Sequence, residues 1–367
     1  MKLVAILAVF SGISPVFAVG YDFGWRPPVI HNLATGDHVP GKPEWTAWFA
    51  NNNKDLVPNV QSDVTKCTGP SKDVWAQTFD DGPWDGTPIV LDHLDAVNVK
   101  TTFWVIGSNI AKRPELLQRA FASGHGIGCH TWSHPTMSKL TDDEVIAELV
   151  YCVRAIYAVL GVYPKYWRPP YGATSSQVRK LSATMGLISV RWSQDSGDWN
   201  FTGKPEIMSV VTNNFKNWLK AGASMDISLE HDLQVDEARA GVAAMDILIQ
   251  NGRKIIPFHE CIGDAYPYDN PILARFFETS GLFQDHWGGG DVVSKLPATT
   301  WTTTKTTTTT TTTITTTTST ASTATIAQTT ATAIKLAEVV RVSSTKSGAS
   351  GVSIGAALTV SALLTMM

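Results

Sequence analysis

Short β-branched and aromatic runs alternate with longer stretches of helical periodicity through the middle of this chain. The runs that predict strands cover residues 74–79, 101–106, 187–192, 226–229 and 253–257. The stretches that predict helices cover residues 114–122 and 141–160, with others starting near Ser175, Ile207 and Asp236. Alternating strands and helices indicate a parallel sheet and therefore the α/β class. We expect a distorted (β/α) barrel, with an open doubly wound sheet as the alternative.

The helix over residues 141–160 has the strongest local signals. Thr141 and Glu144 have the spacing of a capping box, and Gly161 follows the last turn as a stop signal. Apolar residues recur every three or four positions along it: Val145, Leu149, Cys152, Ile156 and Val159. This spacing predicts a helix with one face packed on the sheet.

The chain begins with the pattern of a secretory signal peptide. Met1 and Lys2 precede an apolar run at residues 3–10, and residues 16–18 place small side chains before a cleavage point. The apolar run is too short to cross a bilayer. Residues 1–18 are therefore predicted to be removed on secretion, and a buried N-terminal strand is the alternative.

The other end predicts a stalk followed by a membrane anchor. Residues 299–350 are rich in threonine and serine and have too little apolar surface to pack, which is typical of an O-glycosylated stalk or an unmodified linker. Residues 351–367 are uncharged and largely apolar, which predicts a glycosylphosphatidylinositol (GPI) anchor signal that is cleaved off. A transmembrane helix is the alternative. The candidate attachment residues are Ser343, Ser344 and Ser347.

The predicted folded part lies between these ends and suits one large domain. Residues 19–73 are rich in Pro, Asn and Trp and predict an irregular N-terminal wrap, residues 74–262 hold the alternating elements, and residues 263–298 form a C-terminal extension. The formal net charge of -3 gives no argument for a nucleic-acid partner. We expect a monomer, secreted and anchored at the outer face of the plasma membrane or in the cell wall.

Cysteine usage agrees with an oxidising compartment. The chain has 4 cysteines, an even number that favours two disulfides over free thiols. Of the three ways to pair them, we favour Cys67–Cys261, which would join the two flanks of the core, together with Cys129–Cys152.

Polar residues follow the predicted strands at the point where each strand ends. They are Asp80, Asp81, His130, His134, Arg168, Asp195, Asp198 and His231. In barrel enzymes the site forms at the carboxyl ends of the strands, so these side chains are expected to converge. On a helical turn the rings of His130 and His134 would face the same side. Two histidines and one carboxylate make a three-ligand zinc site with an open position.

The catalytic base of such a site must come from outside the histidine pair, because Thr131 rather than glutamate follows the first histidine. Asp80 and Asp81 can supply it. Neighbouring side chains diverge on extended chain, so one carboxylate can bind the metal while the other reaches a water molecule. The alternatives are a hydrogen-bonded histidine pair without metal and an ordinary turn at residues 80–83.

Five ordered motifs carry a resemblance to a known family. They are Thr78-Phe79-Asp80-Asp81-Gly82-Pro83, His130-Thr131-Trp132-Ser133-His134, Arg168-Pro169-Pro170-Tyr171-Gly172, Asp195-Ser196-Gly197-Asp198-Trp199 and Ile227-Ser228-Leu229-Glu230-His231-Asp232. Residues 74–258 thereby resemble the polysaccharide deacetylases, carbohydrate esterase family 4 with its NodB-homology domain. The layout of signal peptide, threonine-rich stalk and anchor tail resembles that of fungal chitin deacetylases.

The resemblance implies a metal site and a base. Asp81, His130 and His134 would bind one divalent metal ion, normally Zn²⁺, with Co²⁺ as an alternative. Asp80 would be the general base, and Arg168 would keep it ionised and oriented.

The resemblance also implies the groups that act on the leaving amine and the acetyl group. His231 would be the general acid, oriented by Asp198. The backbone N–H of Tyr171 would stabilise the oxyanion, and Trp199 and Leu229 would form the wall of the acetyl pocket.

Aromatic residues beside the motifs are candidates for a sugar-binding groove, because aromatic faces stack on sugar rings. Trp84, Trp132, Trp192 and Tyr171 are of this kind, and a place in the core is the alternative for each of them. Asn200 begins the sequon Asn-Phe-Thr, and a glycan there would crowd the neighbouring Trp199.

The implied reaction is hydrolysis of the N-acetyl groups of N-acetylglucosamine units in chitin, which gives chitosan and acetate at the cell wall. The same chemistry on another acetylated glycan, such as O-acetylated xylan or peptidoglycan, is the nearest alternative. A wall lectin or adhesin is an alternative of another class, since stalked domains with many tryptophans also serve as binders. A binder, however, has no need to keep both Asp80 and His231.

Overall fold

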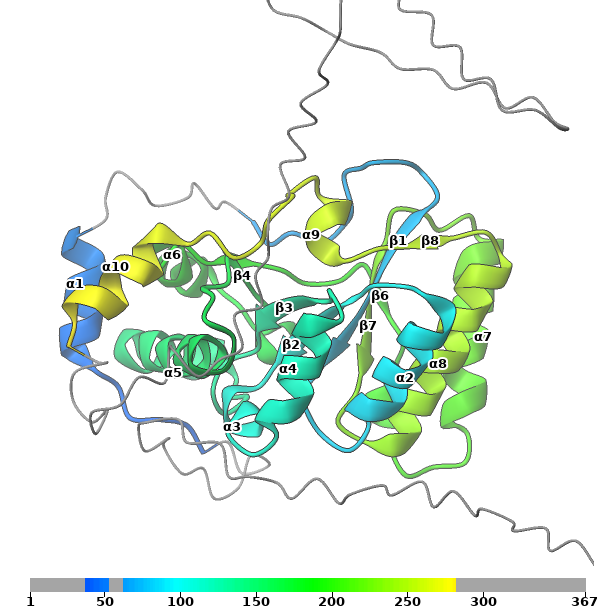
Figure 1. The fold of residues 1–367 in the computed structure, drawn as a ribbon, viewed down its shortest axis with the longest axis horizontal. Coiled ribbons are helices and arrows are strands. Elements are labelled where there is room, and N and C mark those ends of the chain that lie inside the picture. The colour runs from blue at the N-terminus through cyan, green and yellow to red at the C-terminus, as the bar shows by residue number, and fades with distance from the viewer. Residues whose placement is uncertain (1–36, 53–61, 282–367) are drawn as a thin grey trace, which may run out of the picture. The chain divides into compact units, whose positions relative to one another are not determined.

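The computed structural model describes residues 37–52 and 62–281 (Figure 1). The predicted signal peptide, the stalk and the anchor tail with Ser343, Ser344 and Ser347 lie outside these residues. Within the described ranges, no helix combines the length and the apolar character that crossing a membrane requires.

A curled sheet of parallel strands forms the centre of the fold. Its strands are β1 (Val74–Asp80), β2 (Thr102–Val105), β3 (Gly126–Cys129), β4 (Tyr166–Trp167), β5 (Ile188–Ser189), β6 (Gln194–Asp195), β7 (Ile227–His231) and β8 (Lys254–Ile255). Their order is β5-β4-β3-β2-β1-β7-β6, and β8 pairs with the start of β1. All these pairings are parallel. The predicted α/β class and the distorted barrel are confirmed, with the sheet path running from β5 to β6 as a half-barrel.

The α-helices are α1 (Pro43–Asn52), α2 (Thr87–Val97), α3 (Gly107–Ile110), α4 (Pro114–Ala122), α5 (Asp142–Leu160), α6 (Ser176–Thr184), α7 (Ile207–Lys220), α8 (Val235–Gln250), α9 (Phe258–Cys261) and α10 (Pro271–Thr279). Most of the helices cover the outside of this sheet, whereas α1 and α10 lie further out, beside α5 and α6 (Figure 1). The predicted capping box of α5 is present, since Thr141 and Glu144 satisfy each other's backbone N–H groups. The helix ends at Gly161, whose φ of 71° lies in the left-handed region, as the stop signal predicted.

The N-terminal extension contains a helix where an irregular wrap was expected. Trp45 and Phe49 of α1 are buried against Phe276 of α10, with 4.4 Å between the ring centroids of Phe49 and Phe276. Trp45 also contacts Tyr151 of α5 edge-on, at 5.2 Å. Aromatic packing therefore attaches the N-terminal extension to α5 and to α10.

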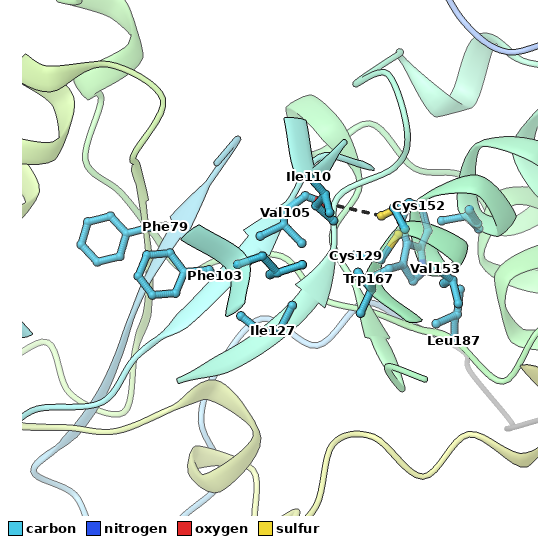
Figure 2. Packing of buried hydrophobic residues seen from close by; sticks show 14 of the residues in the cluster. Phe79, Phe103, Val105, Ile110, Ile127, Cys129, Cys152, Val153, Trp167 and Leu187 are labelled. Carbon is cyan, nitrogen blue, oxygen red and sulfur yellow. Dashed lines mark hydrogen bonds between the residues drawn. The ribbon is translucent and has the colours of Figure 1, made fainter. Parts of the chain in front are cut away.

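The larger apolar core fills the space between the sheet and the helices outside it, among them α5 (Figure 2). Phe103 and Val105 of β2 and Ile127 of β3 are nearly inaccessible to solvent and belong to one cluster with Val153 of α5. Cys129 of β3 and Cys152 of α5 lie side by side in this core (Figure 2).

The predicted Cys129–Cys152 disulfide is wrong, because both residues are free thiols buried in the core. The Cys152 thiol donates to the backbone carbonyl of Val105, at 3.5 Å, and is hydrogen-bonded to Cys129. Each sulfur thus packs as a small side chain between strand and helix. The predicted Cys67–Cys261 disulfide is confirmed and links the segment before β1 to the end of α9.

Candidate metal and catalytic site

The polar residues that follow the strands converge at one end of the sheet, as predicted. Asp80 ends β1 and pairs in register with His231, the last residue of β7. His130 directly follows β3 and Arg168 directly follows β4, and the register pairs Cys129 with Trp167. The parallel pairing of adjacent strands therefore places a carboxylate, a guanidinium and imidazole groups at one edge of the sheet.

Three side chains form a possible metal centre. The ligand atoms of Asp81, His130 and His134 all lie within 4.8 Å of one another. Asp81 Oδ1 is 3.3 Å from His130 Nε2 and 3.2 Å from His134 Nε2. His130 Nδ1 donates to the backbone carbonyl of Arg168 at 2.8 Å, which leaves the Nε2 lone pair available for a metal. One carboxylate and two imidazoles match the donor set of zinc, so these residues fit such an ion.

The charge states of the ligands agree with this interpretation. Burial raises the pKa of Asp81, but the nearby histidines lower it more, so the net shift is downward and the carboxyl stays ionised. Burial lowers the pKa of His134 to about 4, and the side chain is therefore neutral at physiological pH. A carboxylate beside a neutral imidazole is the protonation state that metal binding requires.

The segment that carries both histidines is a loop, and the expected helical turn is wrong. Thr131 has φ 67° and His134 has φ 59°, both in the left-handed region. The hydroxyl of Thr131 accepts a hydrogen bond from the backbone N–H of His134 at 3.0 Å. The two rings nevertheless meet edge to face, with centroids 4.9 Å apart, because two left-handed residues bend the chain back on itself.

Asp80 is held by a buried arginine. Arg168 Nη1 donates to Asp80 Oδ1 at 2.6 Å and to the hydroxyl of Thr78 at 2.8 Å. Burial raises the pKa of Asp80, and the Arg168 guanidinium opposes that rise. The arrangement suits a carboxyl group that exchanges a proton while its position stays fixed.

His231 is held by a buried aspartate. Asp198 lies in the short helix η4 (Asp198–Asn200) and accepts both from His231 Nδ1 and from the His231 backbone N–H, each at 2.8 Å. Burial lowers the pKa of His231, but the carboxylate of Asp198 outweighs it, so the pKa lies well above the ordinary value. His231 is therefore a protonated imidazolium near neutral pH.

The aromatic residues of the motifs divide between the surface and the core. Tyr171 is 65 % exposed and Trp199 is 55 % exposed, and the Tyr171 ring lies 4.6 Å from the ring of His134. Leu229 is buried on β7, two residues before His231. Asn200, the sequon residue, is exposed next to Trp199. The exposed rings are the ones available to a polysaccharide.

Trp132 was predicted to contact substrate, and this is wrong. Its side chain is fully buried and packs against Tyr151 and Gly107. Trp192 is partly buried, and its ring lies under the guanidinium of Arg168 at 5.5 Å. Cys129 faces the core, so its thiol does not compete with His130 for a metal.

Two buried acids that hold the loops of the candidate metal site were assigned no role from the sequence. Asp232 directly follows His231 and accepts hydrogen bonds from the backbone N–H of Gly82 at 3.0 Å and from the Thr87 hydroxyl at 2.6 Å. It therefore fixes the turn after Asp81. The second acid, Glu148, contacts the histidine loop from α5. The available signal for Glu148 was a charged residue between apolar neighbours in a helix.

Comparison with known proteins agrees with this geometry. Residues 68–190 match the family described as polysaccharide deacetylase. Chitin deacetylase 1 of Cryptococcus neoformans var. grubii is 36% identical over 219 residues, which cover 55% of this chain and 46% of that protein. Chitin deacetylase of Amylomyces rouxii is 31% identical over 242 residues, covering 64% of this chain and 56% of that protein. The chain thus spans about half the length of these curated relatives.

The comparison with solved structures covers a larger share of the related protein. The solved structure of the chitin deacetylase from Colletotrichum lindemuthianum superposes with a TM-score of 0.53 and 30% identity, covering 57% of this chain and 94% of that one. Sequence and fold agree, and the chain belongs to the polysaccharide deacetylase family.

Proposed function

We propose that this protein is a metal-dependent chitin deacetylase, which hydrolyses the N-acetyl groups of N-acetylglucosamine units to give chitosan and acetate. The observation that carries the proposal is the edge formed by β1, β3, β4 and β7. There the possible metal ligands lie beside one carboxylate held by an arginine and one imidazolium held by an aspartate. Hydrolysis of an amide needs these functions together.

Asp81, His130 and His134 would hold the ion, which we propose to be Zn²⁺, with Co²⁺ as an alternative. When bound, such an ion supplies Lewis acidity that polarises a carbonyl oxygen and makes a water molecule more acidic. Asp80 takes the proton from that water as the general base. Arg168 holds the Asp80 carboxylate in place throughout, since its guanidinium is buried and hydrogen-bonded on the same edge.

The leaving amine must be protonated before the C–N bond breaks. His231 supplies that proton, because Asp198 keeps its imidazole charged and oriented through Nδ1. Nε2 of the same ring is then the donating atom. Tyr171 offers its backbone N–H to the developing oxyanion, a contribution of about 3–4 kcal/mol for one such donor in other enzymes. Leu229 and Trp199 would enclose the acetyl methyl group.

The proposed substrate follows from the relatives, and the proposed location follows from the sequence patterns near the two termini. The relatives with 36% and 31% identity are both named chitin deacetylases. The predicted signal peptide, threonine-rich stalk and anchor tail support a place at the outer face of the membrane or in the wall, where chitin is accessible. We propose a secreted, GPI-anchored enzyme on that basis.

The test is release of acetate from chitin oligomers by the purified protein. Parallel reactions contain no addition, chelator, and chelator followed by excess zinc, and a further reaction uses Asp80→Asn. Loss with chelator, recovery with zinc and at least a 100-fold lower rate for Asp80→Asn are expected. Release from acetylated xylan alone would keep the chemistry and change the substrate. Tight sugar binding without release from any acetylated glycan would contradict the proposal in favour of a lectin.

A further inference from the structure

A buried carboxylate on α5 contacts the histidine loop from the side of the core. Glu148 has no exposed surface and accepts four hydrogen bonds. Its Oε2 accepts from the backbone N–H groups of Trp132 at 2.9 Å and Ser133 at 2.8 Å. Its Oε1 accepts from the Ser133 hydroxyl at 2.6 Å and from the backbone N–H of Val39 at 3.0 Å. Three of the four donors belong to the loop between the two histidines of the metal site.

The loop needs such support because its backbone conformation is unfavourable for ordinary residues. Left-handed φ values at Thr131 and His134 each cost about 1–2 kcal/mol. The carbonyl groups of Thr131 and Trp132 accept from the N–H groups of Gly107 and Ser108 in α3, at 2.9 and 3.0 Å. Glu148 satisfies N–H groups of the same loop. Helices α3 and α5 thus fix the loop through complementary groups of its backbone.

We propose that Glu148 is a positioning residue of the metal site, and that the hydrogen bonds its side chain accepts from Trp132 and Ser133 set the affinity for the ion by holding the loop between His130 and His134. This inference rests on the proposed metal site. Glu148 lies behind the loop and contacts neither imidazole through any of its four hydrogen bonds. It acts through Trp132 and Ser133. The effect of removing it is therefore expected on metal affinity, separately from stability.

The four donors require hydrogen-bond acceptors at both side-chain oxygens of residue 148. Every contact is an N–H or O–H that donates, and an ionised carboxyl is an acceptor at both oxygens. Burial raises the pKa of Glu148, and these hydrogen bonds oppose the rise. A glutamine can keep one oxygen on the Trp132 and Ser133 N–H groups. Its NH₂ then meets the Val39 N–H, so the N-terminal segment loses its partner while the loop keeps most of its own.

The experiment titrates cobalt(II) into metal-free protein and follows the visible absorption, with the thermal midpoint Tm measured on the same samples. The variants are Glu148→Leu, which is of similar size and removes every acceptor, Glu148→Gln, and Ser133→Ala. Ile156→Ala is the matched control, since it weakens the same helix two turns away through a buried apolar side chain. Expected affinities are at least about tenfold weaker for Glu148→Leu and about threefold weaker for Ser133→Ala. Ile156→Ala should leave the cobalt affinity unchanged, and Glu148→Gln should weaken it no more than Ser133→Ala does, although both lower Tm.

If the cobalt affinity of the variants falls in step with their Tm, so that Glu148→Leu and Ile156→Ala lose affinity alike, the proposal is overturned. If Glu148→Leu does not fold, Ser133→Ala decides, and an unchanged cobalt affinity in that variant also overturns it. The original protein separates the two proposals. Failure of the unsubstituted chain to bind cobalt would contradict the metal site itself, whereas normal binding in every variant would contradict only the role of Glu148.

Discussion

At the scale of single residues, the pairing of His231 with Asp198 has a measurable consequence for the pH dependence of the reaction. His231 must be protonated to act as the acid, and Asp198 is what raises its pKa against the effect of burial. Asp198→Asn removes the charge, so the pKa of His231 falls. We expect the alkaline limb of kcat/KM to move to lower pH by one unit or more, on the order of the shift that a nearby opposite charge produces.

Asp195→Asn is the matched control for that measurement. Its carboxylate lies in the same segment and accepts from the Gly197 N–H and the Trp199 indole, at 3.0 and 3.3 Å. The alkaline limb should stay in place in this variant. An equal shift in both variants would show that His231 responds to overall charge and not to its contact with Asp198.

A second prediction concerns Glu230, which is fully buried on β7 and faces α8 at Gly241. Burial, followed by the nearby Asp198, raises its pKa well above the ordinary value of 4.5. A raised carboxyl pKa contributes stability that is complete below the unfolded value and is lost as the pH rises towards the folded value. Glu230→Gln removes this titration. The Tm of the original protein should therefore fall relative to that of Glu230→Gln between pH 5 and pH 8, and parallel curves would contradict the assignment.

Single residues also show what the sequence can predict. Asp80, Asp81, His130, His134, Arg168, Asp198 and His231 were predictable because each lies at or shortly after the end of a strand of a parallel sheet, where neighbours must meet. Trp132 was not, because residue type does not tell which way a side chain points. The left-handed φ of Thr131 turns the loop so that Trp132 packs in the core. The Cys129 and Cys152 thiols were misjudged because an even cysteine count says nothing about local contacts.

At the scale of elements, the predictable helices are those with signals at their ends. Helix α5 has a capping box and a left-handed glycine, and both were readable in the sequence. Helix α2 begins at Thr87 after Gly86, which has no side chain to cap it, so Pro88 in its first turn was the start signal that the sequence offered. The histidine loop was expected to be helical, because four-residue spacing fits a helical turn as well as it fits a loop with two left-handed residues. The spacing of residues in the sequence therefore does not determine the local backbone conformation.

The close packing of α3 gives a prediction at this scale. A Cβ added to Gly107 would lie 2.5 Å from the ring of Trp132 and 2.9 Å from the backbone Cα of Cys152. The backbone cannot move away easily, so Gly107→Ala should lower the free energy of unfolding by about 1–3 kcal/mol. Chemical denaturation measures this change. Lys112→Ala, an exposed position in the turn after α3, should change it by less than about 0.5 kcal/mol.

At the scale of the whole molecule, the Cys67–Cys261 disulfide closes a very long stretch of chain, with a sequence separation of 194. A cross-link of this kind stabilises chiefly by restricting the unfolded chain, by about 2–5 kcal/mol. The double variant Cys67→Ser/Cys261→Ser should therefore have a lower Tm than the original protein. Reductant should lower the Tm of the original protein and leave that of the double variant unchanged. A response to reductant in the double variant would point to a bond elsewhere.

The two core thiols have a practical consequence. Cys129 and Cys152 have no exposed surface, and burial raises the pKa of Cys152 well above its ordinary value. A thiol reagent can therefore reach them only when the sheet and α5 separate. Under native conditions the rate of alkylation at these two sulfurs would report how often the domain opens. The protein thus contains its own chemical probe of rare opening events, available without denaturant and without an introduced label.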